Sequence, residues 1–235
     1  MVEIERVKTH VKGLDKHIEN GIPKGSISLI CGTPGTMKSS LAYSILYNNA
    51  LKSGLKGVYV TLEQDTKSLK QQMKALNMDK DVSVDFIEFE DVRKKSAKDK
   101  SSIKIMEKLI SDMKGNYDLL VLDSLNAMYS LALIENPRRE IYEFFKSLHS
   151  SGMTSFLVSE MSLDKESFSD YGVEGFLADG IIHLDFKKRG DILKSLERYI
   201  GIVKMRTTNH DTQYFPVLYM GDSFTVYGRE DLELK

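Results

Sequence analysis

The residues best suited to chemistry form one continuous stretch, SISLICGTPGTMKSSL at positions 26–41. It follows the phosphate-binding loop (P-loop) pattern, in which Gly, four residues and then Gly-Lys-Ser/Thr lie between a strand and a helix. Gly32, Lys38 and Ser39 fit this pattern, and Met37 stands where the second glycine is usual. The nucleotide-binding residues predicted by this stretch are Gly32, Thr33, Pro34, Gly35, Thr36, Met37, Lys38, Ser39 and Ser40.

Each part of this loop has a chemical purpose. Glycines let the backbone fold tightly enough for successive N–H groups to point at phosphate oxygens, and the helix that follows adds the positive end of its dipole. Lys38 would reach the β- and γ-phosphates as a point charge, and the hydroxyl of Ser39 would bind Mg²⁺. The alternative is a strand, turn and helix that bind nothing, with a solvated Lys38. The flanking strand and helix that the motif requires favour phosphate binding.

Other polar candidates follow apolar runs further along the chain. Glu63 comes directly after the run 57–62, the run 117–122 leads to Asp123, and another ends in Ser159. Ligands of open parallel sheets bind just outside the carboxyl ends of the strands. An aspartate at a strand end is, taken alone, more often a turn cap. Beside a P-loop, Asp123 and the loop serine would instead form a two-part Mg²⁺ site.

Two cations near the end of the chain form a third group. Lys204 and Arg206 alternate along a predicted strand, so their side chains leave on the same face. Two cations on one face suit a polyphosphate whose charge rises during transfer. A basic stripe on a solvated edge strand, which suppresses aggregation, explains the same spacing equally well.

Composition narrows the possible classes of protein. The 235 residues are 41% hydrophobic, enough for one sizeable α/β domain. The 33 basic and 34 acidic residues give a net charge of −1, so no global charge attracts nucleic acid or a membrane surface. One cysteine, Cys31, excludes an internal disulfide framework. With no run near ~20 apolar residues and no signal-peptide pattern, we expect a cytoplasmic protein without membrane insertion.

Apolar patterns predict the order of helices and strands. Helices are expected after the P-loop and over residues 66–76, 102–113 and 138–150, and strands over 57–62, 84–89, 117–123 and 153–159. Residues 91–102 are charged and read as a solvated connection, with a mobile lid or partner surface as the alternative, and residues 160–175 read as a long loop. From Asp179 onward, short apolar runs follow without helices between them. We predict one α/β domain over residues 1–235, with a mostly parallel central sheet flanked by helices and antiparallel strands at its C-terminal end.

Several of these segments together resemble a KaiC-type domain of the RecA superfamily. They are VKGLDKHIENGIPKGSISLICGTPGTMKSS, VYVTL with the Glu63-Gln64 pair, LLVLDS around Asp123, and IVKMRTTNH near the C-terminus. The resemblance covers most of the chain and implies a RecA-like P-loop NTPase of the single-domain, archaeal type. Many members carry a second carboxylate where this chain has Gln64, and Met37 is a second departure.

The resemblance also implies roles for individual residues. Glu63 stands where the family has the carboxylate that polarises the attacking water, and ATP and Mg²⁺ are the implied ligands. Lys204, Arg206 and His210 fall on the segment that, in the family, reaches the nucleotide of a neighbouring subunit. This implies a homo-oligomer, usually a ring of six subunits with ATP at each interface. A circadian role does not follow, because the chain resembles one half of the two-domain clock protein.

The interpretation reached from the sequence is a Mg²⁺-dependent, ring-forming regulatory or signalling ATPase with an unknown protein partner. A nucleotide-sensing scaffold that hydrolyses little ATP, like a relative in the archaeal motility apparatus, is the second class. A RecA-like DNA-handling ATPase is the third, and near-zero net charge argues mildly against it. Hydroxyl groups are too common in the chain to single out an acceptor for autophosphorylation.

Overall fold

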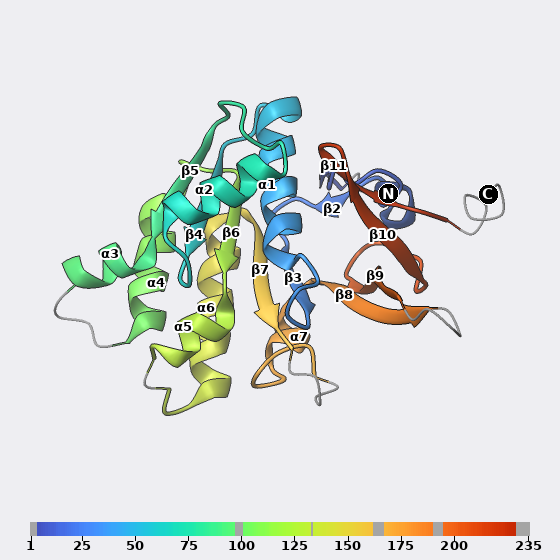
Figure 1. Ribbon diagram of the computed structural model, residues 1–235. Coiled ribbons are helices and arrows are strands. Elements are labelled where there is room, and N and C mark those ends of the chain that lie inside the picture. The colour runs from blue at the N-terminus through green and yellow to red at the C-terminus, as the bar shows by residue number, and fades with distance from the viewer. Residues whose placement is uncertain (1–3, 97–100, 133, 162–166, 190–194, 229–235) are drawn as a thin grey trace.

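Uninterrupted apolar runs form the inner strands of one sheet, because a strand buried on both faces has little room for polar side chains. The computed structural model describes residues 4–96, 101–132, 134–161, 167–189 and 195–228. Within them, nine strands form a sheet in the order β11-β10-β9-β8-β3-β7-β6-β4-β5 (Figure 1). The parallel strands are β3 (Ile27–Gly32), β4 (Gly57–Thr61), β5 (Val84–Glu88), β6 (Leu119–Asp123), β7 (Thr154–Glu160) and β8 (Gly180–Arg189). The strands β9 (Ser195–Met205), β10 (Tyr214–Met220) and β11 (Ser223–Val226) continue the sheet in antiparallel fashion.

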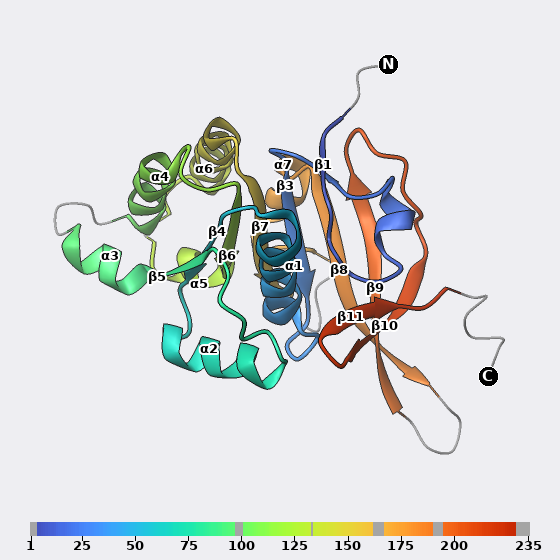
Figure 2. The same ribbon diagram turned by 90° about the horizontal axis from the view of Figure 1, so that it is seen from above.

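Helices cover both faces of this sheet (Figure 2). Each face has its own apolar core. The helices α1 (Lys38–Ser53) and α2 (Thr66–Ala75) pack on one face, with Leu41, Ile45 and Leu69 in the first core. The helices α4 (Ser102–Met113) and α6 (Pro137–Ser151) pack on the other, where Ile110 and Phe144 belong to the second core. These positions confirm the helices predicted from the apolar spacing.

The N-terminal segment packs over the antiparallel end of the sheet. Strands β1 (Arg6–Val7) and β2 (Ile22–Pro23) pair with each other, and the short helix η1 (Asp15–Ile18) lies between them. Apolar side chains of this segment join those of β9 to β11 in the first core. The turn-rich segment predicted before the first strand therefore covers the strands at the other end of the chain.

Besides η1, three short α-helices in the described residues were not predicted. The helix α3 (Phe89–Lys95) replaces the start of the solvated connection expected over residues 91–102, of which residues 97–100 lie outside the described part. Buried Phe89 anchors α3, and its acidic first turn and basic last turn suit the helix dipole. The helix α5 (Leu125–Ser130) begins where Ser124 caps the backbone N–H of Ala127.

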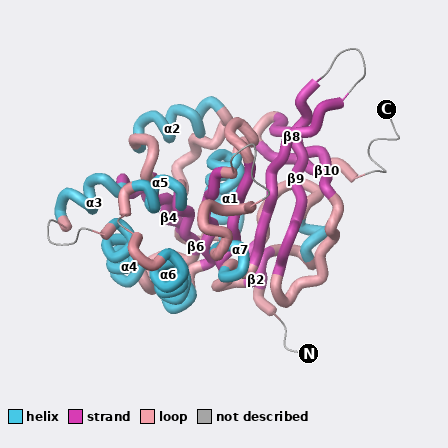
Figure 3. Tube along the Cα trace, turned by 90° about the horizontal axis from the view of Figure 1, so that it is seen from below, coloured by secondary structure: helices cyan, strands magenta, loops and turns pink. Residues whose placement is uncertain are grey.

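The third unpredicted helix, α7 (Glu174–Leu177), lies in and after the long loop expected over residues 160–175. Residues 162–166 of that loop are outside the described part. None of the helices in the described ranges is long and apolar enough to cross a membrane. The parallel strands end at a common edge, which Figure 3 shows from below.

Candidate active site

The P-loop connects the end of β3 to the first turn of α1, as the motif requires. Gly32 has a φ of 155°, and a Cβ there would lie 2.2 Å from the carbonyl oxygen of Leu184, so only glycine fits. The Thr33 carbonyl accepts hydrogen bonds from the Thr36 hydroxyl at 2.8 Å and from Lys38 Nζ at 3.1 Å. The loop is therefore closed around its own backbone, with the lysine held inside it.

Met37, the departure from the pattern, adopts the backbone conformation that favours glycine. Its φ of 73° and ψ of 31° lie in the left-handed region. The side chain is half-buried and packs against the first core. Met37 thus keeps the glycine-type loop shape at the cost of backbone strain, and its side chain has its own packing site.

The two predicted metal ligands meet at the carboxyl edge of the sheet. Asp123 ends β6 and faces the same side of the sheet as α1, whose second residue is Ser39. Burial raises the pKa of the Asp123 carboxyl, while hydrogen bonds from Tyr59 and Ser39 act in the opposite direction. Tyr59 donates its hydroxyl to Asp123 Oδ2 at 2.5 Å. Sequence reasoning missed Tyr59, which stands in a strand as one more apolar residue.

This donor set fits Mg²⁺. The cation prefers oxygen ligands, and protein sites usually supply one or two of them while substrate phosphates and water supply the rest. Ser39 and Asp123 provide a hydroxyl and a carboxylate. In the described ranges, no three His, Cys, Asp or Glu side chains form a group that could hold a metal without such help.

Glu63 lies beside the predicted metal ligand Asp123. Thr61, at the end of β4, pairs with Asp123, so Glu63 follows just beyond the sheet edge. The hydroxyl of Ser124 donates to Glu63 Oε1, and the carboxylate is otherwise exposed to solvent. Ser124, the residue that follows Asp123, therefore orients the Glu63 carboxylate.

A further carboxylate, Glu160, approaches the P-loop from the end of β7. Its Oε1 lies 3.7 Å from Lys38 Nζ. Asn126 fixes the Glu160 backbone, because Oδ1 accepts from the Glu160 N–H at 2.6 Å and Nδ2 donates to the Glu160 carbonyl at 3.2 Å. The buried Ser159 side chain faces the opposite side of the sheet, which it shares with Leu157, so it does not join the P-loop residues.

The predicted cations Lys204 and Arg206 lie near the start of β3, at the edge of the sheet opposite the P-loop. Gly180 pairs with Ser28 at the start of β3, whereas Leu184 pairs with Gly32 at the P-loop. These two levels are about 13 Å apart at roughly 3.3 Å per residue. Lys204 pairs with Ile181, close to the first level. The cations therefore do not reach the P-loop of their own chain.

Both cations contact the C-terminal end of α7. Lys204 Nζ donates to the carbonyls of Gly175, Phe176 and Ala178 at 3.0, 3.2 and 2.6 Å. Arg206 donates to the Phe176 carbonyl at 2.8 Å and to Asp179 Oδ1 at 3.1 Å. These shared contacts confirm that the two side chains leave on one face.

His210 lies in the segment that follows β9. It is half-buried, and its Nδ1 is 3.4 Å from the Asp211 carbonyl oxygen. Like the two cations, it is not brought together with the P-loop of its own chain.

Comparison with known proteins agrees with this geometry. A family model described as "ATPase: KaiC" matches residues 7–230. This chain belongs to the KaiC family of ATPases. A UPF0273 protein of Thermotoga maritima is 28% identical over 97% of this chain and 98% of its own length. A UPF0273 protein of Pyrococcus furiosus is 30% identical over 95% of this chain and 94% of its own length.

Longer and structurally known relatives support the same family. The circadian clock protein KaiC3 of Synechocystis is 28% identical over 91% of this chain but only 43% of its own length. The crystal structure of a KaiC-like protein from Pyrococcus horikoshii matches with a TM-score of 0.79 and 28% identity, covering 96% of this chain and all of the other. The RecA-like fold and the KaiC resemblance inferred from the sequence are thereby confirmed.

One further cation contacts the P-loop of this KaiC-family chain and was not predicted. Arg198 of β9 donates from Nε to the Gly35 carbonyl at 3.2 Å, and its guanidinium lies 5.4 Å from the centre of the Phe186 ring. A Cβ on Gly35 would be 3.8 Å from that ring. Arg198 and Phe186 thus support the outer side of the loop. No sequence pattern marks either residue, because strand pairing alone brings them there.

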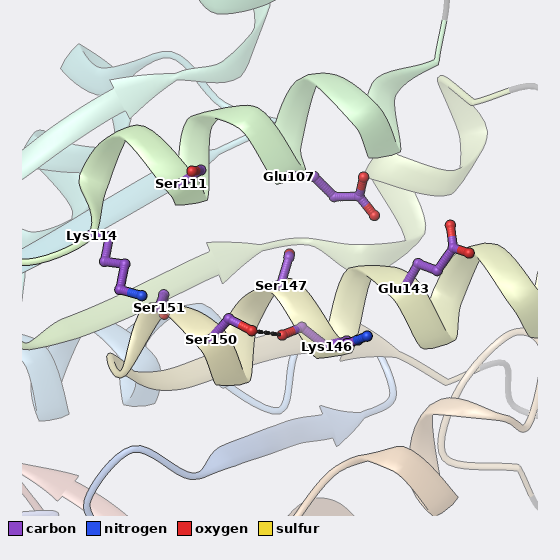
Figure 4. A pocket seen from close by; sticks show the side chains of 8 residues that line it. All are labelled: Glu107, Ser111, Lys114, Glu143, Lys146, Ser147, Ser150 and Ser151. Carbon is purple, nitrogen blue, oxygen red and sulfur yellow. Dashed lines mark hydrogen bonds between the residues drawn. The ribbon is translucent and has the colours of Figure 1, made fainter.

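A groove lined by charged and serine residues lies between α4 and α6, on the face of the sheet opposite α1 (Figure 4). It encloses about 380 Å³. Its lining residues are Glu107, Ser111, Lys114, Glu143, Lys146, Ser147, Ser150 and Ser151. None of the predicted site residues lines this groove.

Proposed function

We propose that this KaiC-family protein binds ATP and hydrolyses it in a Mg²⁺-dependent reaction. The observation that supports this most is the convergence of Lys38, Ser39, Asp123 and Glu63 at one edge of the sheet. These are the parts that P-loop NTPases need: a phosphate cradle, two metal ligands and a residue that orients water.

Each residue has one task in this reaction. The loop backbone and Lys38 hold the phosphates, which take the place of the Thr33 carbonyl and Glu160 as partners of the lysine. Bound Mg²⁺ would neutralise charge on the β- and γ-phosphates, with Ser39 and Asp123 as its protein ligands. Glu63 orients a water and accepts its proton as the water oxygen bonds to the γ-phosphorus and the bond to the β-phosphate oxygen breaks. The products are ADP and inorganic phosphate.

We further propose that the protein forms a homo-oligomeric ring, with six subunits as in the family pattern and nucleotide at the interfaces. The position of Lys204 and Arg206 supports this, because both lie far from the P-loop of their own chain and half-exposed Arg206 is open to a neighbour. His210 lies in the same region. The single domain over residues 1–235, the cytoplasmic location and a regulatory role through a protein partner remain predictions.

One assay separates the three functional classes. ATP turnover is measured with Mg²⁺, with EDTA, and with or without single-stranded DNA, and Lys38→Ala is the inactive control. A regulatory ATPase hydrolyses ATP with Mg²⁺ at a rate that DNA does not change. The turnover of a DNA-handling ATPase rises when DNA is added. A nucleotide-sensing scaffold binds ATP but hydrolyses little of it. Absence of nucleotide binding by the wild-type protein would refute the proposal altogether.

The ring is tested by mixing two inactive variants. Lys38→Ala loses its own nucleotide but presents intact cations to a neighbour, while Arg206→Ala binds ATP and offers no arginine. After subunit exchange, some interfaces combine an intact P-loop with an intact arginine, and turnover should reappear. If native mass spectrometry finds mixed rings and turnover stays at the level of the separate variants, the cations do not act between subunits.

A further inference from the structure

The hydroxyl of Tyr59 contacts one of the residues of the proposed metal site, although the rest of the side chain belongs to the core. Tyr59 is fully buried in β4, and its ring packs 6.0 Å from that of Tyr43 and 5.9 Å from that of Phe86. These contacts involve only the ring, so phenylalanine would make them equally well. The hydroxyl therefore needs a separate explanation.

The partner of this hydroxyl is one of the two predicted metal ligands. Tyr59 donates to Asp123 Oδ2 at 2.5 Å, and the Ser39 hydroxyl lies close to both groups. A buried hydroxyl without a partner would be costly, and here the partner belongs to the site itself. A tyrosine hydroxyl ordinarily has a pKa of about 10, so the phenol is a donor at neutral pH.

We propose that Tyr59 is a positioning residue for the Mg²⁺ site, which rests on the function proposed above. By holding Oδ2, the phenol fixes the rotation of the Asp123 carboxyl group and leaves Oδ1 for the cation. Carboxylates that bind metals are commonly oriented by outer hydrogen-bond donors, and loss of such a donor typically weakens metal affinity about 10- to 100-fold. Tyr59 supplies this donor from the neighbouring strand, since β4 pairs with β6.

The test removes one oxygen atom. Tyr59→Phe is compared with Tyr43→Phe, a matched control that loses a hydroxyl from a ring in the same buried cluster. Calorimetry measures the affinity for a non-hydrolysable ATP analogue in EDTA and across a series of Mg²⁺ concentrations. Thermal unfolding verifies that both variants are folded.

We expect Tyr59→Phe to bind the analogue in EDTA as the wild type does, but to need about 10- to 100-fold more Mg²⁺ for half of the Mg²⁺-dependent gain in affinity. Tyr43→Phe should match the wild type in both measurements. Because binding is read without turnover, a defect in the chemical step does not affect the result.

Three results for the variants would overturn the inference. An unchanged Mg²⁺ midpoint in Tyr59→Phe means that the hydroxyl does not orient the carboxylate. A lower midpoint means that the phenol competes with the cation for Asp123. Equal weakening in both variants means that ring packing is responsible. If the wild type itself gains no affinity from Mg²⁺, the proposed function fails and the role of Tyr59 fails with it.

Discussion

Met37 allows the backbone strain of the P-loop to be measured directly. At φ 73° and ψ 31° it has the conformation that costs a residue with a side chain about 1–2 kcal/mol and costs glycine almost nothing. We compare Met37→Gly with Met37→Ala. Both lose the same packing beyond Cβ, so the difference between them reports the backbone alone.

The expected difference follows from two opposing terms. Alanine keeps the strain of about 1–2 kcal/mol. Glycine avoids it but gains about 0.5–1 kcal/mol more conformational entropy on unfolding. The glycine variant should therefore be more stable than the alanine variant by about 0.5–1 kcal/mol, which corresponds to a few degrees in Tm at about 2–4 °C per kcal/mol for a chain of this size. Since Met37 packs against the core, both variants also lose a shared packing contribution.

The assay is urea unfolding of the nucleotide-free protein, followed by circular dichroism, with thermal unfolding as a second measurement. Equal slopes of the free energy of unfolding against urea concentration would show that the variants unfold from comparable states. If Met37→Ala is as stable as Met37→Gly or more stable, the left-handed conformation at this position is refuted. The explanation of how the loop tolerates methionine would then be wrong.

Two other substitutions test the roles of carboxylates. Glu63→Gln should keep ATP binding and lower hydrolysis by about 10²-fold, the usual size for loss of a positioned base; turnover at the wild-type rate would transfer the role to Glu160. Asp179→Asn removes the negative charge that lies 3.1 Å from Arg206, and it should lower ATP turnover. Mixing this variant with Lys38→Ala should restore turnover, whereas mixing it with Arg206→Ala should not. Rescue by Arg206→Ala would show instead that Asp179 supports its own P-loop through β3.

The local features of this protein were predictable from the sequence. The P-loop could be read because its backbone, lysine and serine come from consecutive residues, so no tertiary contact is needed to bring them together. The long helices and buried strands were predictable for a similar reason. Apolar residues recur about every 3.6 residues in a helix and every 2 in a strand, and this spacing shows which face of the element is buried without reference to its neighbours. The short α3 was missed because its charged composition outweighed its single buried anchor, Phe89.

The partners of these features were decided by the tertiary structure. Strand β4 lies beside β6, and only this adjacency gives Asp123 the hydroxyl of Tyr59, which is 64 residues away in the chain. Arg198 reaches the P-loop because the β8–β9 pair extends past it, whereas Arg206, just beyond the other end of β9, does not. The sequence determined the residue types and the face of the helix or strand on which each residue lies. Apolar periodicity carries no information on strand order or register, so the distances between these groups depended on the folded sheet.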